Sequence, residues 1–262
     1  MSKRLDVLVA DKLGVSREFA KEIILAGKCE IAGKIITKAG AKFPENTPLM
    51  IYAKPPQYVS RGGIKLAKAI DVFALSLQNE QCMDIGASTG GFTDCMLQNG
   101  AKSVIAVENG SKQLHLSLQG DPRVLSMENT DIRSLSPDKL PFLPNFVAVD
   151  LSFISLSIVI PKIAELLAES GNAVLLIKPQ FEAGKGKLCK RGTVREPRLH
   201  MEIIKKLCFD LQNARLMPCG LDFSPITGQN GNREYLIWVT KDKAALSDIN
   251  IEKVVKAAFA EL

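Results

Sequence analysis

The feature that most constrains the fold is a short apolar run that leads directly into a glycine-rich turn and then into a helical pattern. Cys82-Met83-Asp84-Ile85 is followed by Gly86-Ala87-Ser88-Thr89-Gly90-Gly91-Phe92-Thr93. Glycines have no Cβ, so the backbone can turn sharply there and approach a ligand closely. The helix that follows points its free N–H groups over the turn. This unit predicts an α/β fold in which a nucleotide-like cofactor binds at the turn.

Short buried strands alternate with helices from residue 61 to residue 262. Alternation of this kind is typical of a doubly wound, mostly parallel sheet, here Rossmann-like with seven strands. The strands are expected at 81–85, 103–108, 123–127, 145–150, 172–177, 215–223 and 234–240. The helices are expected at 63–75, 91–99, 111–119, 155–169 and 197–212, followed by an amphipathic terminal helix from Ile251.

The first 53 residues have a different pattern, which predicts a small α+β domain. Two short helices, ending at Gly14 and Gly27, precede a hairpin that turns at Ala32-Gly33. Residues 54–60 begin with Lys54-Pro55-Pro56 and form the predicted linker to a second domain at 61–262. The first 60 residues carry ten basic against six acidic residues, and so four of the chain's six net positive charges. This asymmetry favours a polyanionic partner, although a merely solvated basic surface would have the same composition.

Length and composition exclude several classes of protein. The 262 residues are 46% hydrophobic and 24% charged, which is ordinary for a globular chain. No apolar run is long enough to span a bilayer, and the start lacks the apolar core of a signal peptide. The six cysteines include no C-x-x-C pair. We therefore expect reduced thiols, no metal site and a cytoplasmic protein without membrane contact. We also expect a monomer or a weak dimer.

Two classes of enzyme fit the glycine turn poorly. A dinucleotide-binding dehydrogenase requires G-x-G-x-x-G, and Ser88 stands where the middle glycine should be. A serine hydrolase could use Gly86-Ala87-Ser88-Thr89-Gly90 as its G-x-S-x-G elbow. That chemistry needs a histidine base, and both histidines, His115 and His200, fall inside expected helices.

A methyltransferase that uses S-adenosylmethionine fits the turn best. This cofactor has no phosphates, so it tolerates Ser88. Glu108 ends the second strand, where a carboxylate would hold the ribose hydroxyls, and Asp131 follows the third strand on the adenine side. Asp150 ends the fourth strand at the edge where ligands bind in such sheets. The predicted cofactor-binding residues are Asp84, Gly86, Ser88, Thr89, Gly90, Gly91, Phe92, Glu108, Asp131 and Asp150.

Four further polar residues occupy positions that point to a catalytic site. Lys65 opens the first helix of the larger domain, and Asp150 and Lys178 come directly after apolar strands. Glu234 begins the last strand. Charged residues that directly follow the apolar strands of a buried sheet indicate a functional site more than a solvated surface. We therefore expect these four residues to converge at one edge of the sheet.

Four motifs, in order, resemble the TlyA family over essentially the whole chain. They are Ser60-Arg61-Gly62-Gly63-Ile64-Lys65-Leu66, the glycine turn from Asp84, Val149-Asp150-Leu151-Ser152-Phe153-Ile154-Ser155-Leu156, and Ile177-Lys178-Pro179-Gln180-Phe181-Glu182. That family joins a small RNA-binding domain, of the type first known from a small-subunit ribosomal protein, to an FtsJ-like ribose methyltransferase domain. Residues 1–53 are similar to the former. One departure is Glu108-Asn109-Gly110, where the family usually shows Asp-Val-Gly, and it predicts altered geometry at the ribose.

The resemblance implies a catalytic Lys-Asp-Lys-Glu tetrad formed by Lys65, Asp150, Lys178 and Glu234. It also implies 2′-O-methylation of cytidine in ribosomal RNA, free or in a ribosomal subunit, with S-adenosylmethionine as the methyl donor. The expected RNA-binding residues are basic and lie on the small domain, before the first helix of the larger domain, and in the glycine-rich loop 182–196: Arg4, Arg17, Lys21, Lys28, Lys34, Arg61, Lys185, Lys187, Lys190 and Arg191. For that loop, a solvated segment without RNA contact is the alternative.

The proposed chemistry is in-line transfer of the sulfonium methyl group to a ribose 2′-hydroxyl. Lys178 is the candidate either to remove the hydroxyl proton or to stabilise the developing alkoxide, and the sequence leaves both roles open. The target nucleotide is expected to flip out of its stack into a pocket near Phe153 or Phe181. Two other functions remain as alternatives: a non-catalytic factor in ribosome assembly that binds ribosomal RNA, and a haemolysin-like, membrane-active protein.

Overall fold

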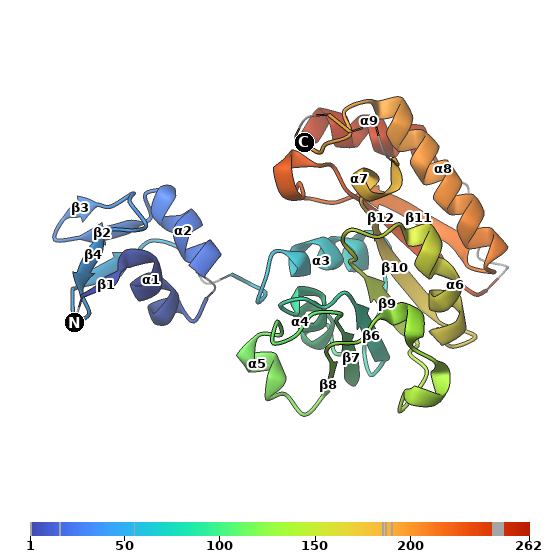
Figure 1. Cartoon of the computed structure of the whole chain (residues 1–262), viewed down its shortest axis with the longest axis horizontal. Helices are drawn as coiled ribbons and strands as arrows, with labels where there is room; N and C mark the ends of the chain where they lie inside the picture. Colours follow the sequence, from blue (N-terminus) through green and yellow to red (C-terminus); the bar gives the residue numbers. More distant parts are fainter. Residues whose placement is uncertain are drawn as a thin grey trace. The chain divides into compact units, whose positions relative to one another are not determined.

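The structure is a computed structural model that describes residues 2–15, 17–54, 56–184, 186, 188–189, 191–242 and 249–262. The chain forms two compact units, Met1–Ser60 and Arg61–Leu262, which we call the smaller and the larger unit (Figure 1). None of the helices in the described ranges combines the length and the apolar character that a membrane crossing requires.

The smaller unit packs two helices against a short antiparallel sheet. Its elements are β1 (Ser2–Arg4), α1 (Leu5–Leu13), α2 (Arg17–Leu25), β2 (Cys29–Ile31), β3 (Lys34–Ile35), β4 (Lys42–Pro44) and β5 (Leu49–Ile51). Strands β3, β2 and β5 form one sheet, and β1 pairs with β4. Leu5, Val9, Ile24 and Cys29 are fully buried between helices and sheet. Gly14 ends α1 in the left-handed conformation, as glycine after a helix commonly does.

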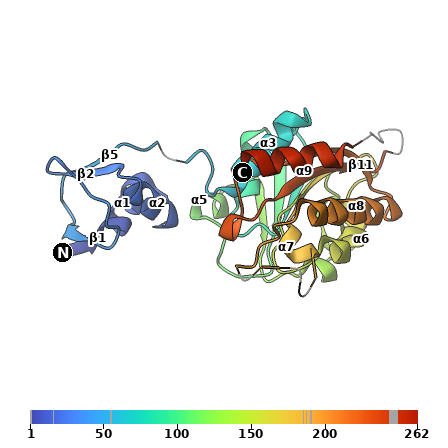
Figure 2. The same ribbon diagram turned by 90° about the horizontal axis from the view of Figure 1, so that it is seen from above.

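The larger unit is a three-layer α/β structure, which confirms the predicted fold class. Its helices are α3 (Gly62–Val72), α4 (Gly91–Gln98), α5 (Leu116–Gln119), α6 (Leu156–Leu166), α7 (Pro179–Glu182), α8 (Pro197–Asn213) and α9 (Ile251–Glu261). Its strands are β6 (Gln81–Ile85), β7 (Ser103–Val107), β8 (Val124–Met127), β9 (Phe146–Val149), β10 (Asn172–Ile177), β11 (Met217–Phe223) and β12 (Tyr235–Thr240). Helices α3 and α4 lie on one side of the sheet, and α6 and α8 on the other (Figure 1 and Figure 2).

The seven strands follow the order β11-β12-β10-β9-β6-β7-β8. Strand β12 is antiparallel to both of its neighbours, whereas β10, β9, β6, β7 and β8 are parallel. The central strands are buried on both faces, as continuous apolar runs in parallel sheets usually are. The carboxyl ends of β6, β7, β9 and β10 therefore meet at one edge, and the start of β12 joins them there.

The expected helix over 111–119 is wrong in its first half. The Glu128 carboxylate accepts hydrogen bonds from the backbone N–H groups of Lys112, Gln113 and Leu114, at 2.6–3.3 Å, and holds these residues in a loop. Helix α5 begins only at Leu116, and His115 caps it instead of lying inside a helix. The short strands β1 and β4 were not expected, because three residues carry almost no periodic signal.

Candidate active site

The glycine turn after β6 is shaped by close backbone contacts. Gly86 has a φ of +87°, and a Cβ there would overlap the backbone carbonyl oxygen of Asp150. Gly90 has a φ of +93°, and a Cβ there would overlap the Leu114 and Leu118 side chains. Residues other than glycine rarely adopt such angles. These two positions require glycine, and the turn lies directly against the end of β9.

Asp84 lies behind the turn and is completely buried. Its Oδ2 accepts hydrogen bonds from Thr93 N (2.8 Å) and Thr93 Oγ1 (2.7 Å), which tie β6 to the first turn of α4. Its Oδ1 is buried without a hydrogen-bond partner among the described residues. Burial raises the pKa of Asp84 to about 7; the Thr93 hydrogen bonds oppose this shift, and nearby Asp150 and Glu108 add to it. Three carboxylates thus lie close together here, an environment that favours a cationic ligand.

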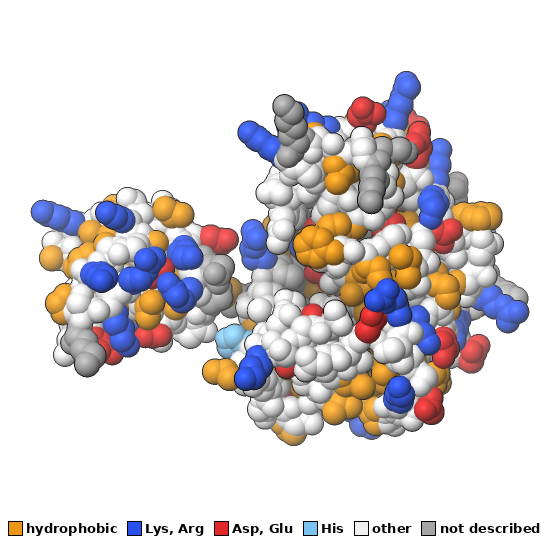
Figure 3. Space-filling view, viewed as in Figure 1, with side chains coloured by type: hydrophobic (Ala, Val, Ile, Leu, Met, Phe, Trp, Pro, Cys, Tyr) orange, Lys and Arg blue, Asp and Glu red, His pale blue; other side chains and the backbone are white. Residues whose placement is uncertain are grey.

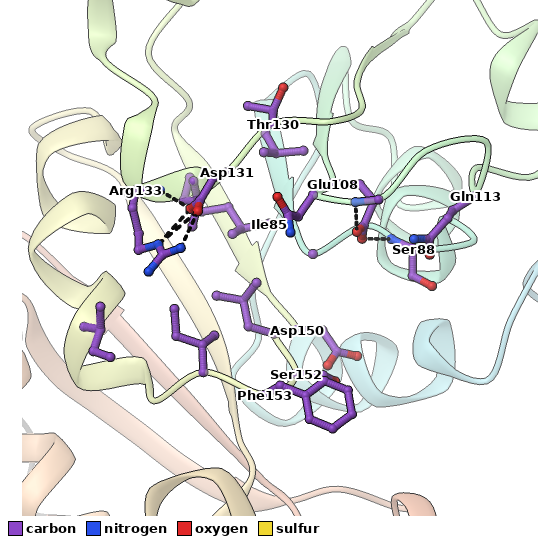
Figure 4. Close-up of a pocket in the computed structure, with 18 of the residues that line it drawn as sticks. Ile85, Ser88, Glu108, Gln113, Thr130, Asp131, Arg133, Asp150, Ser152 and Phe153 are labelled. Atoms are coloured by element: carbon purple, nitrogen blue, oxygen red, sulfur yellow. Dashed lines mark hydrogen bonds and ion pairs between the residues drawn. The ribbon is translucent and has the colours of Figure 1, made fainter.

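Glu108 joins the glycine turn to the loop that follows β7 (Figure 4). Its Oε2 accepts a hydrogen bond from Ser88 N at 2.9 Å, and its Oε1 accepts one from Gly110 N at 2.7 Å. Each carboxylate oxygen has a second lone pair that can accept a further hydrogen bond, for example from a hydroxyl. The side chain is therefore fixed in orientation and keeps acceptor capacity toward the cavity.

A cavity of about 840 Å³ opens between the ends of β6, β7, β8 and β9 (Figure 4). The predicted cofactor-binding residues Gly86, Ser88, Glu108, Asp131 and Asp150 line it. The others in that set are not among its lining residues; Phe92, for example, is 3% exposed and belongs to the core. Phe153, which was expected to border a pocket for the target nucleotide, also lines it. Further lining residues were not predicted to bind the cofactor: Ile85, Val107, Asn109, Gly110, Gln113, Thr130, Ile132, Arg133, Leu151, Ser152, Ile154, Ser155 and Ile158. Most of them follow a strand end, and this position was the one sequence feature that could have indicated a place at the cavity. Their residue types do not by themselves indicate cofactor binding.

Asp131 lines the cavity but is already engaged. It accepts hydrogen bonds from Arg133 Nε (3.0 Å) and Arg133 Nη2 (2.5 Å), and also caps the turn through Arg133 N at 2.9 Å. The Arg133 hydrogen bonds lower the pKa of Asp131 to about 2. The carboxylate therefore stays ionised. Arg133, which was not among the predicted site residues, lines the cavity together with Asp131.

The four tetrad residues converge beside this cavity as two ion pairs. Lys65 Nζ lies 2.5 Å from Glu234 Oε2, and the two side chains are only 11% and 3% exposed. Lys178 Nζ lies 2.5 Å from Asp150 Oδ1 and donates a hydrogen bond to Ser152 Oγ at 2.9 Å. In the β10–β12 ladder Ile177 is paired with Tyr235, so Lys178 and Glu234 follow as neighbours at the sheet edge. The register therefore brings the two ion pairs to the same edge of the sheet.

The segment from Asp150 to Ser155 carries an unusual backbone angle. Phe153 has a φ of +64°, which is rare for a bulky residue and costs roughly 1–3 kcal/mol. Its ring is 87% exposed and lies 5.2 Å, centroid to centroid, from the ring of Phe181. Lys178 Nζ lies 5.9 Å from the centre of the Phe181 ring. An aromatic pair, with Phe153 exposed and Phe181 half-buried, therefore adjoins the Lys178 amine.

The predicted RNA-binding residues of the smaller unit are exposed or partly exposed cations. Arg4 and Arg17 both reach the buried carboxylate of Asp6, with Nη2–Oδ2 distances of 2.8 and 3.2 Å. These two guanidinium groups hold the pKa of Asp6 well below its usual range. Lys28 and Lys34 are exposed and Lys21 is partly buried. Figure 3 shows basic side chains gathered on one face of this unit.

The remaining predicted RNA-binding residues lie in the larger unit. Arg61 immediately precedes α3, and it and Arg191 are exposed. Lys185, Lys187 and Lys190 lie outside the described residues. The loop that carries Arg191 is joined to the segment before β12, because Asn232 Nδ2 donates to Gly192 O at 3.3 Å. It is also joined to α8, where His200 Nε2 lies 3.0 Å from Val194 O. The basic loop is thus anchored beside the residues that lead into β12.

Comparisons with known proteins agree with this geometry. The FtsJ-like methyltransferase family model matches residues 58–241. A candidate rRNA methyltransferase of Bacillus subtilis, YqxC, is 43% identical over 90% of this chain and 84% of that protein. The 16S/23S rRNA (cytidine-2′-O)-methyltransferase TlyA of Mycobacterium tuberculosis is 38% identical over 97% of this chain and 96% of that protein. The solved structure of a candidate hemolysin from Streptococcus thermophilus has a TM-score of 0.81 at 42% identity, over 99% of this chain and 96% of that chain.

Proposed function

The chain belongs to the FtsJ-like methyltransferase family, and on that premise we propose that it methylates the ribose 2′-hydroxyl of cytidine in ribosomal RNA. The observation that carries the proposal is the convergence of Lys65, Asp150, Lys178 and Glu234 beside the cavity. The ribosomal RNA substrate would be free or assembled in a subunit, and we accordingly propose a cytoplasmic location. That the protein is a monomer or a weak dimer remains a prediction.

S-adenosylmethionine fits the cavity as the methyl donor and would supply an electrophilic methyl group. The cofactor carries a sulfonium and an ammonium group, and the cavity adjoins the carboxylates of Asp84, Glu108 and Asp150. We propose that Glu108 accepts hydrogen bonds from the ribose hydroxyls, while Asp131 and Arg133 border the adenine side. The close approach of Gly86 to Asp150 keeps this part of the cavity free of side-chain bulk.

We propose that Lys178 acts as a clamp on the 2′-oxygen. Its ammonium group has three N–H bonds. Within the described part of the chain two of them are directed at Asp150 and Ser152, which leaves one for the substrate oxygen. In this position Lys178 aligns the oxygen with the methyl group and stabilises charge on it, and alignment of this kind contributes roughly 7–11 kcal/mol in favourable cases. The Lys65–Glu234 pair fixes the neighbouring wall of the site.

Replacement of Lys178 tests this role directly. Lys178→Ala should abolish methyl transfer to ribosomal RNA but leave the Kd for S-adenosylhomocysteine, measured by calorimetry, nearly unchanged. Lys162→Ala is the control, because it removes a lysine that forms an ion pair with Glu165 on the same helix. Full activity of Lys178→Ala would remove Lys178 from the mechanism. A flat pH–rate profile is expected for a clamp, and a rate that rises with the loss of one proton would indicate a base instead.

We further propose that the target cytidine flips out and stacks on the aromatic pair Phe153 and Phe181. The high exposure of Phe153 and its place at the cavity rim support this step. A fluorescent base analogue at the target position should brighten when the protein binds, and Phe153→Ala should reduce that change. No fluorescence change with the parent protein would exclude flipping while leaving methyl transfer itself testable.

A further inference from the structure

Glu182 connects two segments of the active site that are far apart in the sequence. It ends the short helix α7, directly after β10 and Lys178. Its Oε2 accepts a hydrogen bond from Ser155 Oγ at 2.6 Å, and its Oε1 accepts one from Leu156 N at 2.7 Å. Leu156 is the first residue of α6, so the carboxylate lies at the positive end of that helix. Both carboxylate oxygens of Glu182 thus bind the end of the connection between β9 and α6, at Ser155 and Leu156.

That connection is a wall of the cavity. All six residues from Asp150 to Ser155 line the cavity. Phe153, in the middle, has its φ of +64°, so this segment needs outside contacts to keep its conformation. A segment with an unfavourable backbone angle relaxes when such contacts are lost, and it would then carry Asp150 and Ser152 away from their present positions.

Beside the backbone bond from Asp150 N to Ile85 O at 2.9 Å, three outside contacts come from the five residues 178–182. Lys178 holds the first part of the segment through Asp150 and Ser152. Phe181 packs against Phe153 in the middle. Glu182 holds the end. The Asp150–Ser155 segment is therefore held at its start, middle and end by residues that follow β10, and Glu182, which holds the end, is not a tetrad residue.

We propose that Glu182 is a positioning residue for methyl transfer. By fixing the end of the Asp150–Ser155 segment, it sets the distance between the cofactor cavity and the Lys178 amine. This inference deepens the proposed function and rests on it. Glu182 itself touches no reacting atom, so its loss should act on cofactor affinity and on kcat, and much less on the KM for RNA.

The test compares Glu182→Ala with removal of another carboxylate, on α8, that also hydrogen-bonds to the first turn of α6. Asp210 is the matched control, because it accepts a 2.5 Å hydrogen bond from Ser157 Oγ in the first turn of α6 without contacting the segment. Glu182→Ala should raise the Kd for S-adenosylhomocysteine about fivefold or more, because the cavity wall is no longer preorganised. It should lower kcat about 10–100-fold, since small misplacements of reacting groups have effects of that size. Asp210→Ala should change neither, whatever it does to the melting temperature.

Two milder variants distinguish a loss of positioning from a general loss of folding. Glu182→Gln keeps an oxygen for Leu156 N and should restore most of the cofactor affinity. Ser155→Ala removes one of the two hydrogen bonds to Glu182, together with the cap that Ser155 Oγ provides for Ser157 N, and leaves the Leu156 N bond in place, so it should give a smaller loss of the same kind. The proposal is overturned if Glu182→Ala binds S-adenosylhomocysteine and turns over as the parent does, or if Asp210→Ala loses cofactor affinity equally. Because S-adenosylhomocysteine binding needs no RNA, a parent protein inactive on every ribosomal RNA would refute the proposed substrate and leave this measurement intact.

Discussion

Replacing Lys65 with methionine should destabilise the larger unit by several kcal/mol. The variant leaves the Glu234 carboxylate, 3% exposed, without the cation that lies 2.5 Å away. Removing one partner of a buried ion pair costs about 3–5 kcal/mol, because an uncompensated charge remains in a place that water does not reach. For a unit of about this size, each kcal/mol lowers the melting temperature by roughly 2–4 °C, so the shift should be roughly 6–20 °C.

The double variant Lys65→Met with Glu234→Gln separates stability from catalysis. Glutamine has the shape of glutamate, which matters because Gly228 packs so closely on Glu234 that even a Cβ at residue 228 would overlap its carboxylate. With both charges removed, no buried charge is left unpaired, and most of the lost stability should return. Methyl transfer should stay absent, because the lysine and the carboxylate are both missing.

Urea unfolding followed by circular dichroism and transfer of a radiolabelled methyl group are the two assays. Lys256→Met is the control, because Lys256 and Glu252 form an exposed ion pair within α9 whose loss should not change stability measurably. A loss below 1 kcal/mol in Lys65→Met would refute the reasoning, since it would mean that water compensates the Glu234 charge. A double variant less stable than the single one would refute it as well.

Three further predictions concern other parts of the structure. The pKa of Asp84 is raised by burial from 3.8 to about 7, so the folded state keeps a proton that the unfolded state loses, and the free energy of unfolding should decline between about pH 4 and pH 7. Asp84→Asn should remove that decline from urea-unfolding curves measured across this window. Gly86→Ala should abolish S-adenosylhomocysteine binding in calorimetry, because a Cβ would overlap the Asp150 carbonyl oxygen at a φ of +87°. Arg17→Ala should weaken RNA binding and lower the slope of log affinity against log salt by about 1 in filter-binding assays.

Each of these predictions has a control or a contradicting result. Gly184→Ala is the partner of Gly86→Ala, because Gly184 also has a positive φ, of +76°, but a Cβ there would meet nothing within 4 Å. Equal loss of binding in both variants would show that the backbone angle, and not the contact with β9, is decisive. Arg123→Ala removes an arginine paired with Asp121 in the larger unit and should leave the salt slope unchanged. Parallel pH curves for the parent and Asp84→Asn would contradict the raised pKa.

The sequence predicted the sheet well because its strands are continuous apolar runs. The expected strands 81–85 and 172–177 have the observed bounds of β6 and β10, and the other expected strands of the larger unit differ from the observed ones by at most two residues at either end. The helical pattern at 111–119 failed because a distant carboxylate, Glu128, captures the N–H groups that a helix would need. Periodicity describes a residue's own neighbours and cannot reveal such a competitor.

The candidate site was predictable to the extent that its residues stand at strand ends. Asp150, Lys178 and Glu234 were identified in this way, and Lys65 from its place in the first turn of a helix. The structure joins the four in two ion pairs, while their catalytic roles stay predictions. Arg133 and Glu182 were not identified, because an arginine after a strand and a glutamate in a short helix are common on surfaces. Their importance comes from hydrogen bonds to residues that only the folded chain places nearby.

The position of β12 has a consequence for synthesis of the protein. This strand is added late in the sequence yet lies between β10 and β11, and Glu234, just before it, pairs with Lys65 from the first helix of the larger unit. A nascent chain that stops before Glu234 has the glycine turn but lacks both the Lys65–Glu234 ion pair and the strand that joins β11 to β10. Under the proposed mechanism, we therefore expect methyl transfer only after nearly the whole chain has been translated, and no activity from products that end before Glu234.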